Sequence, residues 1–281
     1  MTANPTIPEI RPGQSIELLK ALHILTREGK LNQDSRRKLK QVHHLAQFIE
    51  PLLREAMALH PDVTLVDHGA GKSYLGFILY DLILKHADAA RVYGIEVRQA
   101  LVDQSSALAR RLGFDRMTFV HATAADAASM PGLPDRVDMV TALHACDTAT
   151  DDAIAFALAK NAQFVVVVPC CQAEVASVLR RNKSSPTAPE SLCELWRHPL
   201  HTREFGSQIT NVLRCLELEA HGYQVSVTEL VGWEHSMKNE LIIAKRIDQP
   251  NPRAARKLEG LLNTLGLESL RERFHAIEAN R

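Results

Sequence analysis

From residue 63 onward, the chain alternates short runs of β-branched and apolar residues with amphipathic segments of helical period. That alternation is typical of consecutive β-α-β units, in which a helix joins two parallel strands by a right-handed crossover. We expect parallel strands at 63–67, 91–95, 117–121, 137–142 and 163–168. The helices between them are expected near 73–87, 99–112, 124–129 and 149–160. The pattern therefore predicts an α/β fold built on a doubly wound sheet.

The segment after the fifth strand narrows the fold class further. We expect helices at about 172–182 and 203–220, and then two strands at 223–230 and 239–246. The loop between these last strands is too short for a crossover, so the strands must be antiparallel neighbours. A nicotinamide-binding domain would instead end with a sixth parallel strand. The order predicts the Rossmann-like, seven-stranded sheet of class I methyltransferases, with an antiparallel last strand.

Helical segments flank this core on both sides. Residues 1–60 are expected to form a helical N-terminal segment, 61–248 the cofactor-binding domain, and 249–281 a helical C-terminal tail. The second N-terminal helix begins with basic residues that suit either phosphate contacts or an ordinary solvated face, namely Arg36, Arg37, Lys38 and Lys40. The N-terminal helices either bind substrate or cover the sheet.

Charge and cysteine content limit the partners. Lys plus Arg and Asp plus Glu number 33 each, so any RNA would have to bind through a local basic patch. No apolar run is long enough to span a bilayer, and no N-terminal signal is visible, so we expect no membrane contact. The odd number of cysteines, five, fits reduced thiols and a cytoplasmic protein. The oligomeric state is left open.

A glycine-containing turn follows the first strand. Asp67, Gly69, Gly71 and Lys72 lie where a Rossmann-type backbone approaches its cofactor closely. Glu96 ends the second strand, where a carboxylate commonly binds ribose hydroxyls. The alternative is that the glycines only make a tight turn and Glu96 caps a helix.

The same turn resembles the end of a phosphate-binding loop, because Gly71 and Lys72 are followed by Ser73. That motif also requires a glycine five residues before Gly71, where this chain has Val66. A nucleoside triphosphatase is therefore disfavoured.

Polar residues also follow the fourth and fifth strands, which end at the same edge of the sheet. Leu143 is expected to line the cofactor site, and Asp147 and His144 are candidates to orient the acceptor or take its proton. Asp147 could instead cap the following helix. Cys146, Cys170 and Cys171 are expected to line the substrate site.

Two other chemistries are conceivable for these residues. Zinc in a deaminase-like site would need a nearby glutamate and spaced cysteines, whereas Cys170 and Cys171 are adjacent, so no metal is expected. Cys146 or Cys170 could also attack a pyrimidine ring, but a small buried thiol is the commoner outcome.

The loop between the last two strands contains Trp233, Lys238 and Asn239. It would overhang the site and offers one aromatic ring, one cation and one amide, which suits nucleic acid. An ordinary exposed turn is the alternative. We expect Lys238 and Asn239 to line the entrance.

Four sequence blocks in order carry a family resemblance, at 67–75, 143–151, 169–172 and 235–239. Together they resemble a bacterial family of S-adenosylmethionine-dependent methyltransferases, the methyltransferase domain 32 type, over about residues 12–247. The last block departs from the family pattern at Ser236 and Met237. A more distant likeness links the second and third blocks to tRNA 2′-O-methyltransferases of eukaryotes.

The resemblance implies an enzyme that transfers a methyl group from S-adenosylmethionine to an acceptor, with RNA as the first expectation. Protein or small-molecule methylation and a non-catalytic binding module are the alternatives. Where the family has an acid that binds adenine, this chain has Thr123, with Asp126 three residues later. These two residues complete the expected cofactor contacts.

Overall fold

The computed structural model describes residues 9–143, 145, 147–169, 172–181, 194–230 and 240–275. Its centre is a seven-stranded sheet with strand order β3-β2-β1-β4-β5-β7-β6. The strands are β1 (Thr64–His68), β2 (Arg91–Glu96), β3 (Met117–His121), β4 (Met139–Leu143), β5 (Phe164–Val168), β6 (Tyr223–Glu229) and β7 (Glu240–Arg246).

The first five strands are parallel, and β7 pairs antiparallel with both β5 and β6. All five predicted parallel strands and the closing antiparallel pair are confirmed, with ends shifted by up to two residues. The strand order reverses between β1 and β4, because β2 and β3 lie on one side of β1 and the remaining strands on the other. Ligands of open α/β sheets bind in the crevice at such a reversal.

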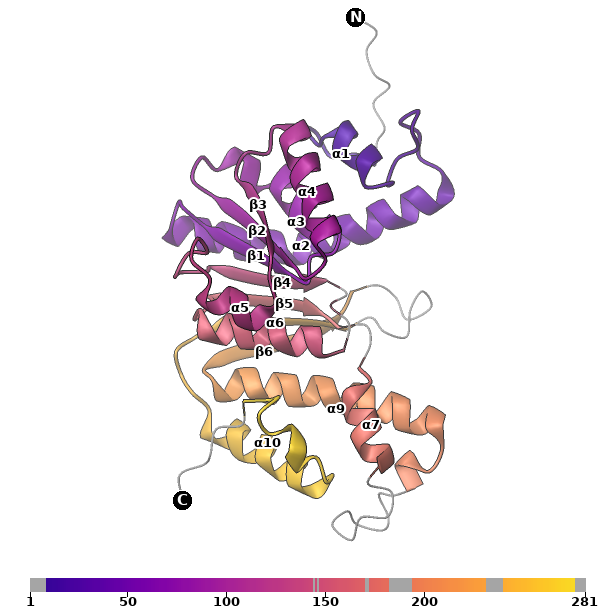
Figure 1. The fold of residues 1–281 in the computed structure, drawn as a ribbon, viewed down its shortest axis with the longest axis vertical. Coiled ribbons are helices and arrows are strands. Elements are labelled where there is room, and N and C mark those ends of the chain that lie inside the picture. Colours follow the sequence, from indigo (N-terminus) through magenta and orange to yellow (C-terminus); the bar gives the residue numbers. More distant parts are fainter. Residues whose placement is uncertain are drawn as a thin grey trace, which may run out of the picture.

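Helices cover both faces of the sheet (Figure 1). They are α1 (Ile16–Ala21), α2 (Gln33–Leu59), α3 (Tyr74–Leu82), α4 (Gln99–Leu112), α5 (Ala124–Ser129), α6 (Thr148–Ala159), α7 (Glu174–Arg181), α9 (Pro199–Ala220) and α10 (Pro252–Thr264). Short 3-10 helices lie at η1 (Leu84–His86), η2 (Glu194–Trp196) and η3 (Glu268–Leu270).

Two cores follow from the alternation of side chains along the strands. On one face, Leu65 and Val166 pack in a cluster with the N-terminal helices and α3. On the other face, Val66 and Val165 pack against α5 and α6, including Phe156. Strand β5 is buried at every position, because helices pack against both faces of the sheet. This burial accounts for its nearly continuous run of valines.

The N-terminal segment is part of the first core rather than an independent unit. Helix α2 contributes Leu45, Ile49 and Leu53, all nearly inaccessible to solvent, and it starts at Gln33 after the side chain of Asn32 caps its first turn. The C-terminal helix α10 packs in a third cluster with α7 and α9, at the end of the molecule opposite α1 in Figure 1. Within the described residues, no helix combines the length and apolar content needed to cross a bilayer.

Candidate cofactor and active site

The turn after β1 has the backbone conformation that its glycines suggest. Gly69 and Gly71 have φ angles of 62° and 57°, in the left-handed region where other residues are strained. The amide of Ala70 donates to the carbonyl of Ile95, which ties the turn to the end of β2. A ligand can therefore approach the backbone closely between β1 and β2.

Asp67 lies beneath this turn and organises it. Its Oδ1 accepts a hydrogen bond from Thr141 Oγ1 at 3.0 Å, and its Oδ2 accepts from Ser73 Oγ at 2.9 Å and from the Gly76 amide at 3.3 Å. Burial raises the pKa of Asp67 to about 6, although these hydrogen bonds favour the ionised form. The carboxylate thus links β1, β4 and the start of α3.

Glu96 lies at the end of β2, with its side chain only 5% exposed. Its Oε2 accepts from the Gly71 amide at 2.7 Å, and its Oε1 accepts from the Arg98 amide and Nε at 3.0 and 2.8 Å. Burial opposes ionisation, but these donors outweigh it and hold the pKa of Glu96 below its ordinary value. The guanidinium of Arg98 thus occupies this carboxylate, while the side chain of Arg98 itself is 65% exposed.

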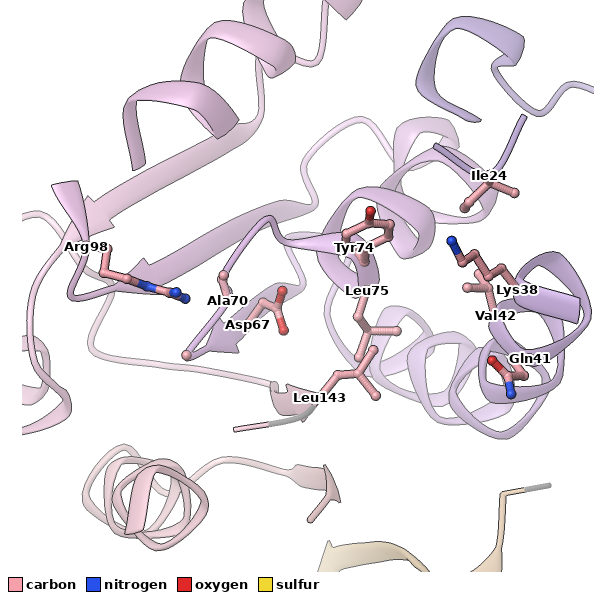
Figure 2. Close-up of a pocket in the computed structure, with 12 residues that line it drawn as sticks. Ile24, Lys38, Gln41, Val42, Asp67, Ala70, Tyr74, Leu75, Arg98 and Leu143 are labelled. Atoms are coloured by element: carbon pink, nitrogen blue, oxygen red, sulfur yellow. The ribbon is translucent and has the colours of Figure 1, made fainter. Parts of the chain in front are cut away.

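A cavity of about 390 Å³ joins these features, within the size range of small-molecule sites. Its lining residues come from five parts of the chain and are Ile24, Lys38, Gln41, Val42, Asp67, Gly69, Ala70, Gly71, Tyr74, Leu75, Arg98 and Leu143. Figure 2 shows Arg98 on one side of the glycine turn and the α2 residues on the other, with Asp67 and Ala70 between them.

Four of the sequence-predicted cofactor residues line this cavity: Asp67, Gly69, Gly71 and Leu143. Glu96 is not among the lining residues, but it bonds to two of them, Gly71 and Arg98. Lys72 is exposed and is not among the lining residues. Thr123 and Asp126 also lie outside the lining, where they bond to each other at 2.7 Å in the cap of α5.

Asp147 precedes α6 with a φ angle of 51°. Its side chain does not cap α6; its Oδ1 instead accepts from the amides of Ala173 and Glu174, at 2.8 and 3.1 Å, and so caps α7. The carboxylate therefore connects the loop after β4 to the loop after β5. The predicted site residues His144, Cys146, Cys170, Cys171, Lys238 and Asn239 lie outside the described residues.

A buried polar network supports the Asp147 loop. Arg214, fully buried in α9, donates to both oxygens of Asp151 at 2.7 and 2.8 Å and to the Asp147 carbonyl at 3.0 Å. Arg214 also bonds Asn211, which accepts from Gln172 at 3.1 Å. Gln172 belongs to the block after β5, so a single buried arginine holds the ends of two strands together.

Sequence reasoning misses several residues of the site. Arg98, Tyr74 and the α2 residues Lys38 and Gln41 reach the cavity, and Arg214 supports its edge. The signals for them in the sequence are weak, because Lys38 stands out only as one member of a basic run.

His68 is buried, and neither ring nitrogen has a hydrogen-bond partner. Burial lowers the pKa of His68 to about 4.

The described part of the chain contains one cysteine and no cluster of metal-binding side chains. No group of three or more His, Cys, Asp or Glu side chains is arranged there to hold a metal ion. Cys215 in α9 is a free thiol, and burial raises its pKa to about 12, which keeps it protonated and inert.

The pattern of a methyltransferase domain family, the methyltransferase domain 32 family, matches residues 37–178. The match begins in α2 and includes the glycine turn, Glu96 and Asp147. The chain belongs to this family. Its fold is the class I, Rossmann-like methyltransferase fold, and the cofactor of the domain is S-adenosylmethionine.

Two curated proteins are similar to parts of this chain. A glutathione S-transferase C-terminal domain-containing protein of Bos taurus is 24% identical over 241 residues, which cover 77% of this chain and 34% of the relative. A protein-L-isoaspartate O-methyltransferase of Roseiflexus castenholzii is 30% identical over 154 residues, which cover 54% of this chain and 65% of the relative. The matched segment thus spans about a third of the first relative and just under two thirds of the second.

Solved structures of methyltransferases are among the weak structural matches to this chain. An S-adenosylmethionine-dependent methyltransferase from Aquifex aeolicus is 18% identical, with a TM-score of 0.41 and coverage of 70% of this chain and 89% of that one. Fibrillarin from Aeropyrum pernix, with natively bound S-adenosyl-L-methionine, is 13% identical, with a TM-score of 0.39 and coverage of 66% of both chains.

The residues of the cavity fit this cofactor. Gly69 and Gly71 leave the backbone open to close approach, because their φ angles exclude most side chains. At the end of β2, Glu96 holds a nearly buried carboxylate, the group that commonly binds ribose hydroxyls in Rossmann-type domains. Buried Asp67 lines the cavity beneath the turn. Uncharged and apolar groups of Tyr74, Leu75 and Leu143 complete the walls.

Proposed function

We propose that this protein transfers a methyl group from S-adenosylmethionine to RNA. The observation that carries the choice of acceptor is a second, open hollow of about 770 Å³ beside the N-terminal helices. Three cations, Lys20, Arg27 and Arg111, and the imidazole of His23 line it, whereas Glu17 is the one carboxylate among its described lining residues. A hollow with excess positive charge suits phosphate groups.

This hollow adjoins the cofactor cavity through a shared stretch of chain. His23 and Leu25 line the hollow, and Ile24 between them lines the cavity. On α2, Ser35 lines the hollow, and Lys38, one helical turn later, lines the cavity. An RNA held by its backbone in the hollow would thus lie next to the site of methyl transfer. The hollow would then be the local basic patch that RNA binding requires in a protein with no net charge.

The cofactor supplies a sulfonium-bound methyl group that is already electrophilic, so the protein has to align the acceptor, exclude water and accept a proton. In this proposal Asp147 and His144 orient the acceptor or take its proton. Cys146, Cys170 and Cys171 border the acceptor, and Lys238 and Asn239 lie at the entrance. Thr123 and Asp126 bind adenine, and Lys72 flanks the cofactor turn. The enzyme acts in the cytoplasm with reduced thiols and without a metal.

The test is a transfer assay with cofactor carrying a radioactive methyl group, offered to RNA, protein and small-molecule fractions of a cell extract. The proposal predicts label in RNA that ribonuclease releases. Arg27→Glu with Arg111→Glu should reduce RNA labelling by about 10-fold or more and flatten its decline with added salt, because phosphate contacts are lost. Arg256→Glu, at an exposed position on α10, is the matched control and should behave like the unaltered protein.

A protein acceptor is the second candidate. It is favoured by the 30% identity with a protein-L-isoaspartate O-methyltransferase over 154 residues, more than half of this chain. If the label enters protein in an alkali-labile form and RNA stays unlabelled, this candidate replaces RNA.

A further inference from the structure

One wall of the cofactor cavity comes from α2, a helix that precedes the first strand of the sheet. Lys38, Gln41 and Val42 of α2 line it, at positions three and four residues apart that share one face of the helix. In Figure 2 the side chain of Lys38 extends from α2 toward Tyr74. Since Leu39, Leu45 and Ile49 of the same helix are buried in the core, α2 holds this wall in a fixed place.

The position of Glu96 sets the direction of the bound cofactor. Arg98, which is bonded to Glu96, lies at one end of the cavity, and the α2 residues lie at the other (Figure 2). If the ribose hydroxyls bind Glu96, the extended amino acid portion of the cofactor passes over Gly69 and Gly71 and ends at α2. That portion carries one ammonium group and one carboxylate group.

The charged residues along the cavity agree with this orientation of the cofactor. Among its described lining residues, the cations are Lys38 and Arg98, and the carboxylate is Asp67. Arg98 lies at the Glu96 end, where it binds both carboxylate oxygens at 2.8 and 3.2 Å. Lys38 lies at the α2 end, so its position suits a ligand carboxylate there, with the Gln41 amide as a neighbouring donor.

We propose that α2 completes the cofactor site, with Lys38 and Gln41 binding the α-carboxylate of the amino acid portion. The N-terminal segment then selects cofactors that carry this group and discriminates against adenosine derivatives that lack it. The inference rests on the proposed function only in requiring that this cavity binds S-adenosylmethionine and its product.

Calorimetry with two ligands tests this directly. S-adenosylhomocysteine carries the amino acid portion, and 5′-methylthioadenosine has the same adenosine and a thioether without it. Lys38→Ala should weaken binding of S-adenosylhomocysteine by about 10- to 100-fold, as expected for a lost charge-assisted hydrogen bond, and leave binding of methylthioadenosine unchanged. Lys38→Arg should recover part of the loss because it keeps the charge.

Two control variants separate a specific effect of Lys38 from a general loss of binding. Lys40→Ala alters an exposed lysine on the same helix outside the cavity lining, and it should change neither affinity. Glu96→Ala should weaken both ligands alike, because both carry the ribose hydroxyls. Circular dichroism of each variant checks that the helical content of the protein is unchanged.

Either of two outcomes overturns the inference. Equal weakening of both ligands by Lys38→Ala would place the adenosine at α2, and unchanged binding of S-adenosylhomocysteine would remove Lys38 from the site. Failure of the cofactor assignment looks different, because the unaltered protein would then bind neither ligand, and a failure of RNA as acceptor would leave the binding of both ligands unchanged.

Discussion

Asp67 precedes the glycine turn and is almost fully buried. Its carboxylate accepts hydrogen bonds from β4, from Ser73 and from the start of α3. Its main role in the fold is therefore to fix the shape of the turn. Ser73 contributes to the same shape, because it is fully buried and its φ angle of 48° lies in the left-handed region. The cofactor turn is shaped by side chains beneath it as well as by its glycines.

Gly76 tests this arrangement, because a Cβ atom there would lie 2.5 Å from Ser73 Oγ and 3.2 Å from Asp67 Oδ2. Gly76→Ala should lower the free energy of unfolding by about 1–3 kcal/mol through overpacking and weaken cofactor binding. Gly260→Ala in α10, where no atom lies within 4 Å of the added Cβ, should be neutral or stabilising. Urea denaturation of both variants checks this, and a harmless Gly76→Ala would refute it.

The raised pKa of Asp67 predicts a specific pH dependence. Because the folded-state value is about 6 against an ordinary 3.8, its contribution to stability is fully present below about pH 4 and is lost as the pH rises through 6. Asp67→Asn removes this titration, and the Thr141 hydroxyl can rotate to accept from the new amide.

The difference in free energy of unfolding, unaltered protein minus Asp67→Asn, should therefore fall between pH 4 and pH 7 by about 2–3 kcal/mol and then level off. Urea denaturation of both proteins at each pH provides the measurement. A difference that is constant over this range would show that folding does not raise the pKa of Asp67.

Single residues show where sequence reasoning reaches its limit. Asp67, Gly69 and Gly71 could be predicted because their spacing follows one strand and one turn. The contact between Asp67 and Thr141 spans 74 positions, and the contact between Asp147 and Ala173 spans 26, so neither follows from local pattern. Arg98 was missed because only its side-chain geometry brings it to Glu96.

At the scale of helices and strands, the period of apolar residues predicted the parallel strands closely. The short final loop predicted the antiparallel pair β6 and β7, and both predictions are confirmed. Helix α3 ends at Leu82, earlier than the expected 87, and the chain continues through the 3-10 turn η1. The helix that Asp147 caps was also misjudged, since its carboxylate accepts from the first amides of α7, not of α6.

Asp147 can be tested for both of its roles at once. Asp147→Ala removes the acceptor for α7 and should cost about 0.5–2 kcal/mol of stability. Asp147→Asn keeps an acceptor oxygen and tolerates the positive φ angle, so its stability should stay near that of the unaltered protein. If Asp147 also accepts the proton, Asp147→Asn should slow methyl transfer by about 100-fold or more. A stable Asp147→Asn variant with full transfer activity would leave the residue as a cap alone.

At the scale of the whole molecule, the flanking helices are integral to the fold. Helices α1 and α2 share a core with one face of the sheet, and α10 shares a separate core with α7 and α9. The sequence predicted helices in both flanks and left open whether the N-terminal pair binds ligands or covers the sheet. Helix α2 does cover the sheet, and it also lines the cofactor cavity. Amphipathic period shows which face of a helix is buried, but not what lies beside its polar edge.

The cavity between β1, β2 and α2 is expected to bind S-adenosylmethionine. Titration calorimetry of the purified protein with S-adenosylmethionine, with ATP and NAD as controls, measures this binding. We expect saturable binding of S-adenosylmethionine alone, weakened by Glu96→Ala. Absence of binding, or a preference for ATP or NAD, would contradict it.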